Sequence, residues 1–235
     1  MISFSGNLYA GGENQAAGAR RVGLGFAYTG VRGDFWALFH NPAGIAGIEK
    51  MEAGAFVERR FLLKQLNYGT VGFVMPFKGD KHFAGFDASG FGFGGYTESK
   101  IGLTYAALLL DRLSLGAKVN YVRTTITNYG GKSALFVDFG LLAAITDNIS
   151  AGFRVYNASQ SYISKPLEEK VPTTLDAGIA YQASDKVLVV ADVQKQVNFP
   201  ASFRGGVEYS ILPILKARIG ASTQPTTFNA GLGLV

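Results

Sequence analysis

Apolar and polar side chains alternate with a period of two along most of the chain. Between Leu113 and Val122, every second residue is apolar and the residues between them are polar or glycine. This period is typical of β-strands, whose successive side chains point to opposite faces of a sheet. The pattern predicts twelve strands, near residues 50–58, 64–76, 81–91, 98–110, 113–124, 132–146, 149–157, 172–182, 186–195, 202–211, 214–222 and 226–235.

The length of these segments separates two kinds of β protein. Strands of soluble sheets average about five or six residues, whereas a tilted membrane-spanning strand needs about nine to eleven. Alternate connections are short, as at 111–112 and 183–185, and several of the others are longer, as at 125–131 and 158–171. We therefore predict an all-β transmembrane antiparallel up-and-down β-barrel, in the lipid bilayer of a Gram-negative outer membrane.

Composition removes several other classes of protein. The longest apolar run, Tyr105 to Leu110, is six residues, whereas a spanning helix needs about 20. The absence of cysteine excludes disulfides and thiol chemistry, and the basic residues behind the net charge of +5 are too scattered to predict nucleic-acid binding. Met1 to Ala10 lacks the basic start and apolar core of a signal peptide. Since an outer-membrane protein requires one, we expect a mature or clipped N-terminus.

Catalytic and metal-binding patterns are missing from the sequence. His40 and His82 stand alone without ligand spacing, and there is no Gly-x-Ser-x-Gly motif. The pairs Gly23-x-Gly25 and Gly92-x-Gly94 do not continue into a dinucleotide fingerprint, so we interpret them as sites of close backbone packing or strand kinks. We expect no enzyme activity, no cofactor and no metal.

The first fifty residues do not follow the alternation. Residues 11–48 are rich in glycine and alanine, with a helical stretch near Asp34 to Phe39 and a turn at Asn41-Pro42. Such a segment before the first strand is suited to plugging a barrel. We therefore divide the chain into a hatch or plug at 1–49 and a barrel at 50–235.

This segment also resembles a known family. The Gly/Ala-Arg run, Gly33-Asp34, the aromatic stretch and Asn41-Pro42-Ala43-Gly44 are similar to the start of the FadL-type outer-membrane transporters, a broad group that includes the PorV and PorQ components of type IX secretion in Bacteroidetes. The motif covers about forty residues, and the remainder matches as barrel strands. The resemblance implies fourteen strands around an internal hatch. Because twelve are counted and the terminal aromatic is missing, we expect C-terminal truncation.

Charged residues lie on the polar faces of the predicted strands. Facing lipid, each would cost up to about 2–4 kcal/mol near the bilayer midplane, so we expect them to point into the lumen. They are expected either to pair and clamp the hatch, with two hatch arginines joining the network, or to form a site for an anionic head group. This predicted network consists of Arg20, Arg21, Lys118, Asp138, Arg154, Asp176, Asp192, Arg204, Glu208, Lys216 and Arg218.

Two functions remain open. The first is a channel for passive uptake of hydrophobic small molecules, through a gap made when the hatch or a kinked strand shifts. The second is a non-enzymatic part of a protein secretion or surface-attachment machinery, whose protein partner contacts the loop from Ala158 to Val171. The resemblance favours the channel slightly. Five hatch residues would line its path or simply pack the plug: Phe26, Tyr28, Phe35, Trp36 and Phe39.

Overall fold

The computed structural model describes residues 17–59, 67–77, 79, 81–164, 169–197 and 199–234. Three short helices come first: α1 (Ala19–Gly23), and the 3-10 helices η1 (Phe35–Phe39) and η2 (Pro42–Ile45). The strands are β1 (Glu52–Arg59), β2 (Asn67–Phe77), β3 (His82–Phe93), β4 (Tyr96–Leu110), β5 (Leu113–Ile126), β6 (Gly130–Ala144), β7 (Ile149–Tyr156), β8 (Tyr162–Ser164), β9 (Glu169–Lys170), β10 (Thr174–Ser184), β11 (Val187–Gln196), β12 (Ser202–Leu212), β13 (Leu215–Thr223) and β14 (Thr226–Leu234).

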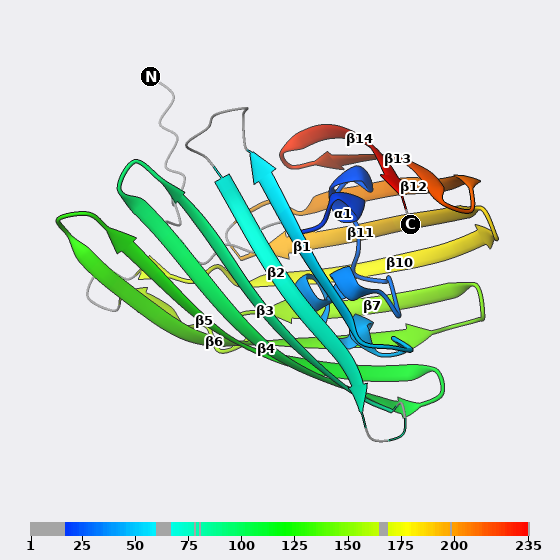
Figure 1. Ribbon diagram of the computed structural model, residues 1–235, viewed down its shortest axis with the longest axis horizontal. Coiled ribbons are helices and arrows are strands. Elements are labelled where there is room, and N and C mark those ends of the chain that lie inside the picture. Colours follow the sequence, from blue (N-terminus) through cyan, green and yellow to red (C-terminus); the bar gives the residue numbers. More distant parts are fainter. Residues whose placement is uncertain are drawn as a thin grey trace.

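A single antiparallel sheet of twelve strands forms the wall. Its order is β1 to β7 followed by β10 to β14, so consecutive wall strands are neighbours throughout. Figure 1 shows this sheet curving around the blue N-terminal helices. All twelve predicted strands are confirmed, as is the up-and-down topology. Within the described residues the sheet has twelve strands, whereas the resemblance implied fourteen; β8 and β9 form a separate hairpin.

The wall is apolar outside and polar inside, the reverse of a soluble sheet. On β5, Val119 and Tyr121 point outward and are 43% and 41% exposed, whereas the intervening Asn120 is 1% exposed. Large apolar side chains are exposed in the same way around the sheet. Such a continuous apolar exterior requires lipid rather than water. Among the described residues, no helix has the length and apolar character needed to cross a membrane.

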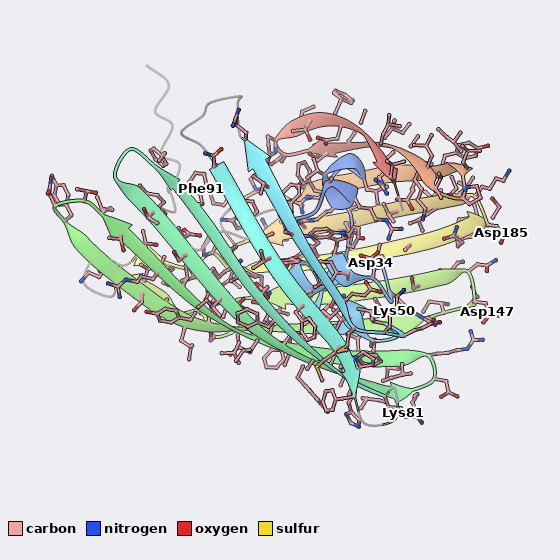
Figure 2. All side chains as sticks on the ribbon, viewed as in Figure 1. Asp34, Lys50, Lys81, Phe91, Asp147 and Asp185 are labelled. Carbon is pink, nitrogen blue, oxygen red and sulfur yellow. The ribbon has the colours of Figure 1, made fainter. Side chains whose placement is uncertain are left out.

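The strand connections define two ends of the wall. The turn end holds the connections at 78–81, 111–112, 145–148, 185–186 and 213–214, and the loop end holds the others. Figure 2 places Lys81, Asp147 and Asp185 at the turn end and Phe91 toward the loop end. The longest connection, 157–173, lies at the loop end as predicted. The expected sorting by length is weaker than predicted, because the loop end also holds two-residue turns at 94–95 and 224–225.

The long connection, called here the lid loop (residues 157–173), folds partly inward, although one of the two functions uses it as an external contact surface. Ile163 and Val171 are buried, and they pack in one cluster with Phe136 and Tyr156 of the inner wall. The Asn157 backbone N–H donates to the Asp138 carboxylate (2.9 Å). Of this loop, residues 165–168, with Lys165-Pro166 and Glu168, lie outside the described residues.

Residues 17–48, called here the hatch, lie inside the curve of the sheet near its turn end. Local capping explains its two 3-10 helices. Asp34 accepts a hydrogen bond from the Trp36 backbone N–H (2.8 Å) at the start of η1. Asn41 accepts one from the Ala43 N–H (3.1 Å) at the start of η2, where Pro42 takes the first helical position. The turn predicted at Asn41-Pro42 is confirmed.

Candidate lumen site

A belt of glycines on the inner wall gives the hatch its seat. A Cβ atom added to all but one of them would lie less than 3.0 Å from a hatch atom, so the hatch approaches the wall more closely than a side chain there permits. At the exception, Gly178, the added atom would first meet Asp192 of the wall, with Thr29 of the hatch 3.0 Å away. At Gly206 on β12, the added atom would lie 2.6 Å from Leu24 Cα. The belt crosses most strands of the wall and consists of Gly54, Gly72, Gly85, Gly116, Gly140, Gly152, Gly178, Gly206 and Gly220.

The belt differs between two sides of the lumen. On β1 to β3, the glycines face side-chain ends: Cβ atoms at Gly54 and Gly72 would meet the rings of Phe35 and Phe39. From β5 to β13, most of the glycines face hatch backbone or Asn41, as with Leu24 at Gly206. Gly25 is the reciprocal case, since its added Cβ would lie 2.5 Å from backbone atoms of the wall. The interpretation of Gly23-x-Gly25 as close backbone packing is confirmed at Gly25.

Glu208 on β12 is the centre of an ion-pair clasp. Arg20 of α1 donates to both of its carboxylate oxygens (2.9 Å each), and Arg218 of β13 donates to Oε2 (2.6 Å). Arg20 also pairs with Asp34 (2.5 Å), which accepts a hydrogen bond from the Tyr28 hydroxyl (2.6 Å). Lys216 lies 3.6 Å from Glu208. The clasp therefore joins two parts of the hatch to two wall strands, as predicted for Arg20.

Asp192 on β11 binds the hatch backbone directly. Its Oδ2 accepts hydrogen bonds from the backbone N–H groups of Tyr28 (2.7 Å) and Thr29 (2.9 Å), and from the Thr29 hydroxyl (2.7 Å). On another strand of the wall, β5, Lys118 donates a hydrogen bond to the Leu38 carbonyl of the hatch (3.1 Å). Each bond satisfies a polar group that the lumen would otherwise bury unpaired, and each is directional.

Wall-to-wall pairs complete the charged side. Arg154 donates to Asp138 (2.9 Å), and both are buried. Asp176 accepts a hydrogen bond from Gln194 (2.5 Å), which in turn accepts one from Arg204. The inward orientation that the alternation predicted therefore holds for this network.

Arg21 departs from the expected pairing of hatch to wall. Its Nε donates to the Phe26 carbonyl within the hatch (3.2 Å), its Nη1 lacks a hydrogen-bond partner, and no described acidic residue lies in ion-pair range. Burial, reinforced by repulsion from Arg204, lowers the pKa of Arg21 to about 9. For Arg20, burial acts in the same direction, but Tyr28, Asp34 and Glu208 overcome it and raise its pKa.

Three buried charged residues lie outside the network that the sequence predicted: Asp87, Glu98 and Lys100. Asp87 on β3 pairs with Lys118 (2.5 Å), and Lys100 on β4 lies 5.8 Å from the Tyr156 ring centroid. Asp87 is the single acidic residue of its strand and has the inward parity. The alternation along β3 therefore predicts that Asp87 points into the lumen.

The apolar side of the lumen carries a file of aromatic rings. At the loop end, Phe93 contacts Tyr96 (ring centroids 5.5 Å apart) and Phe91 (5.9 Å). Phe91 is the ladder partner of Tyr68, which contacts Phe56 (6.4 Å). Phe56 contacts Trp36 of the hatch (6.3 Å), which adjoins Phe35 and Phe39. The file thus runs along β1 to β3 from the loop end to the hatch.

The five hatch residues expected to line a path divide between the two sides. Phe35, Trp36 and Phe39 belong to the aromatic file, whereas Tyr28 belongs to the ion-pair clasp. Phe26 lies beneath the Arg21 guanidinium, 6.0 Å from it, with a φ of 69°. Burial raises the pKa of Tyr28 against the opposing charge of Arg20, and Asp34 raises it further, so the hydroxyl stays protonated and donates to Asp34.

The two histidines lie on opposite faces of the wall, His40 in the hatch and His82 outside. His40 Nε2 donates to the Ala17 carbonyl (2.7 Å), and burial, with the charge of Arg21, lowers the pKa of His40. His82 lies on the outer face, where its Nδ1 and the Tyr105 hydroxyl form a hydrogen bond (2.6 Å). Among the described residues, no group of three His, Asp or Glu side chains could hold a metal ion.

The fold and lumen define a transmembrane β-barrel of the Gram-negative outer membrane with an internal hatch. No family profile and no curated protein matches the sequence. The structure is similar to the Ralstonia pickettii toluene transporter TbuX (TM-score 0.62, 13% identity, 92% of this chain and 88% of that chain covered). It is also similar to the P. putida toluene transporter TodX (0.63, 13%, 89% and 83%) and a Pseudomonas aeruginosa FadL homologue (0.56, 14%, 86% and 78%). The chain therefore has the FadL-type outer-membrane barrel fold.

Proposed function

We propose that this protein is a non-enzymatic outer-membrane channel through which small hydrophobic molecules diffuse passively. The observation that carries the proposal is the aromatic file from Phe93 to Trp36, which offers an apolar surface from the loop end to the hatch. Rings of Phe, Tyr and Trp bind apolar and aromatic solutes without hydrogen bonds. The solved structures named as toluene transporters share this fold, which agrees with such a cargo.

The glycine belt changes the expected mechanism. A hatch fitted against backbone and held by Asp192 and Glu208 resists displacement as a body. We therefore place the path beside the hatch, along β1 to β3, where side-chain ends rather than backbone fill the contact. Rotamer changes of side chains leave the backbone in place, so such a path opens without moving the hatch. No energy source is needed because the cargo moves down its gradient.

The alternative of a docking component for protein secretion receives less support. Its expected contact surface, the lid loop, places Ile163 and Val171 inside the lumen rather than outside. The hatch motif Asp34, Asn41, Pro42, Ala43 and Gly44 serves in our proposal as a structural lock on the wall.

A pair of substitutions at one position tests the channel. Phe56→Leu keeps the file apolar, whereas Phe56→Gln places a polar amide in it. We expect uptake of labelled toluene by cells with intact outer membranes to stay within about twofold for Leu and to fall about tenfold for Gln, which is the effect of about 1.4 kcal/mol on a barrier.

Trp36, the only tryptophan, supplies the second measurement. Toluene bound in the file should shift the emission of Trp36 to shorter wavelength in the folded barrel, and benzoate at the same concentration should not. Equal uptake by both Phe56 variants, with Trp36 emission unaffected by toluene, would contradict the proposal. Folding of each variant is checked by its faster migration before boiling.

A further inference from the structure

The outer face of the wall carries one deep apolar groove, across β3 to β7 and toward the turn end. It encloses about 640 Å³, within the range of about 300–1,000 Å³ typical of ligand pockets. Ala107 marks its bottom: it points outward, yet it is 8% exposed, whereas its outward neighbours Tyr105 and Leu109 are 48% and 55% exposed. The sides are formed by Tyr105, Leu109, Leu115, Phe139, Leu141 and Phe153.

The floor of this groove is one backbone layer thick. Gly116 and Gly140 are ladder partners and line the groove through their main chains. Directly behind them, η2 fills the inner side, because Cβ atoms on either glycine would collide with Asn41, Pro42 or Ala43. The hatch thus closes the groove from the lumen, so any occupant must come from the lipid side.

The turn end of the groove is chemically different from the rest. The His82 ring stacks on Tyr105 (ring centroids 6.0 Å apart) and closes the groove there with a polar edge. The Lys81 carbonyl accepts the Leu108 N–H (2.8 Å), and the Arg112 carbonyl accepts the Ala144 N–H (2.8 Å). Both basic side chains are exposed. Two basic side chains are therefore anchored beside strands that form the groove, and the Arg112 guanidinium also pairs with the exposed Asp147 (2.7 Å).

We propose that this groove binds a single phospholipid of the periplasmic leaflet, with one acyl chain over Gly116 and Gly140 and its phosphate beside Lys81 and Arg112. Short turns of outer-membrane barrels face the periplasm, so the turn end meets the head groups of that leaflet. Basic side chains at this level attract anionic phosphate. An acyl chain suits a groove that is apolar along its length and has basic side chains at one end.

Native mass spectrometry of the folded barrel, titrated with phosphatidylglycerol, tests the assignment. Ala117→Trp fills the groove, and Ala191→Trp adds the same side chain to the outward face of β11, away from it. We expect the wild type and Ala191→Trp to retain one lipid, and Ala117→Trp to bind it at least tenfold more weakly. The double variant Lys81→Ala/Arg112→Ala should weaken binding about fivefold.

Two results would overturn the proposal. One is equal lipid retention by both tryptophan variants, which would show that the groove is not the site. The other is a protein dimer that Ala117→Trp abolishes while the retained lipid stays, which would assign the groove to a second copy. Migration of the unboiled protein confirms that each variant is folded.

Discussion

The two sides of the lumen hold the same hatch by different means. On β1 to β3, rings and aliphatic side chains fill the space between hatch and wall, as Phe35 and Phe39 do against Gly72. From β5 to β13, backbone meets backbone, and carboxylates such as Asp192 and Glu208 bind named hatch atoms. Apolar contacts are non-directional, whereas charge-assisted hydrogen bonds fix position. The charged side therefore sets where the hatch lies, and the apolar side is left free to adapt.

Alanine substitutions at one glycine on each side of the lumen should give the largest difference in stability between the two sides. In Gly206→Ala, the new Cβ would lie 2.6–2.7 Å from Leu24 backbone atoms, which cannot move without shifting the hatch. In Gly72→Ala, its nearest neighbours are the ends of Leu38 and Phe39, 2.9 Å away. We expect losses in the free energy of unfolding of about 3 kcal/mol or more and of about 1 kcal/mol, respectively, in urea titrations.

Gly69→Ala is the control, since an added Cβ there would meet no heavy atom within 4 Å. Similar losses for Gly206→Ala and Gly72→Ala would mean that the two sides do not differ in the way described.

Removal of one carboxylate should have the next largest effect. Asp192→Ala leaves the N–H groups of Tyr28 and Thr29 buried without their acceptor, at a cost of about 2 kcal/mol. Asp192→Asn keeps an acceptor oxygen and should recover at least half of that loss. Asp185→Ala, on an exposed turn, is the control (Figure 2). An Asp192→Ala variant as stable as Asp185→Ala would show that the hatch position does not depend on this bond.

The strands could be predicted from the sequence because alternation is a local property. Each of the twelve predicted segments overlaps a wall strand, and Lys118, Asp138 and Arg154 face the lumen because neighbouring residues fix their parity. The hatch motif predicted a helical stretch from Asp34 and a turn at Asn41-Pro42, because Asp34 and Asn41 each accept a hydrogen bond from the N–H group two residues further on. That η2 begins at this turn was not predicted.

The contacts between distant segments could not be predicted in this way. Which carboxylate meets Arg20, and that Arg21 turns back to Phe26, depend on how the hatch is placed among strands nearly 200 residues away. The sequence of the lid loop does not alternate between apolar and polar residues, so the burial of Ile163 could not be predicted from its neighbours. The glycine belt is partly visible in the sequence, because four of its glycines stand at positions of the polar face: Gly116, Gly140, Gly152 and Gly178. The sequence does not show why a side chain is excluded there, since the reason is the close approach of the hatch.

Spin labels on successive residues of β5 test most directly whether each strand alternates between lipid and lumen. The chain has no cysteine, so single cysteines from Val119 to Val122 can be labelled without background. Collision rates with oxygen, which concentrates in the bilayer, should be high at 119 and 121 and low at 120 and 122, where Asn120 and Val122 are buried. Equal rates at all four positions, or the opposite order, would contradict the assignment of the apolar face to lipid.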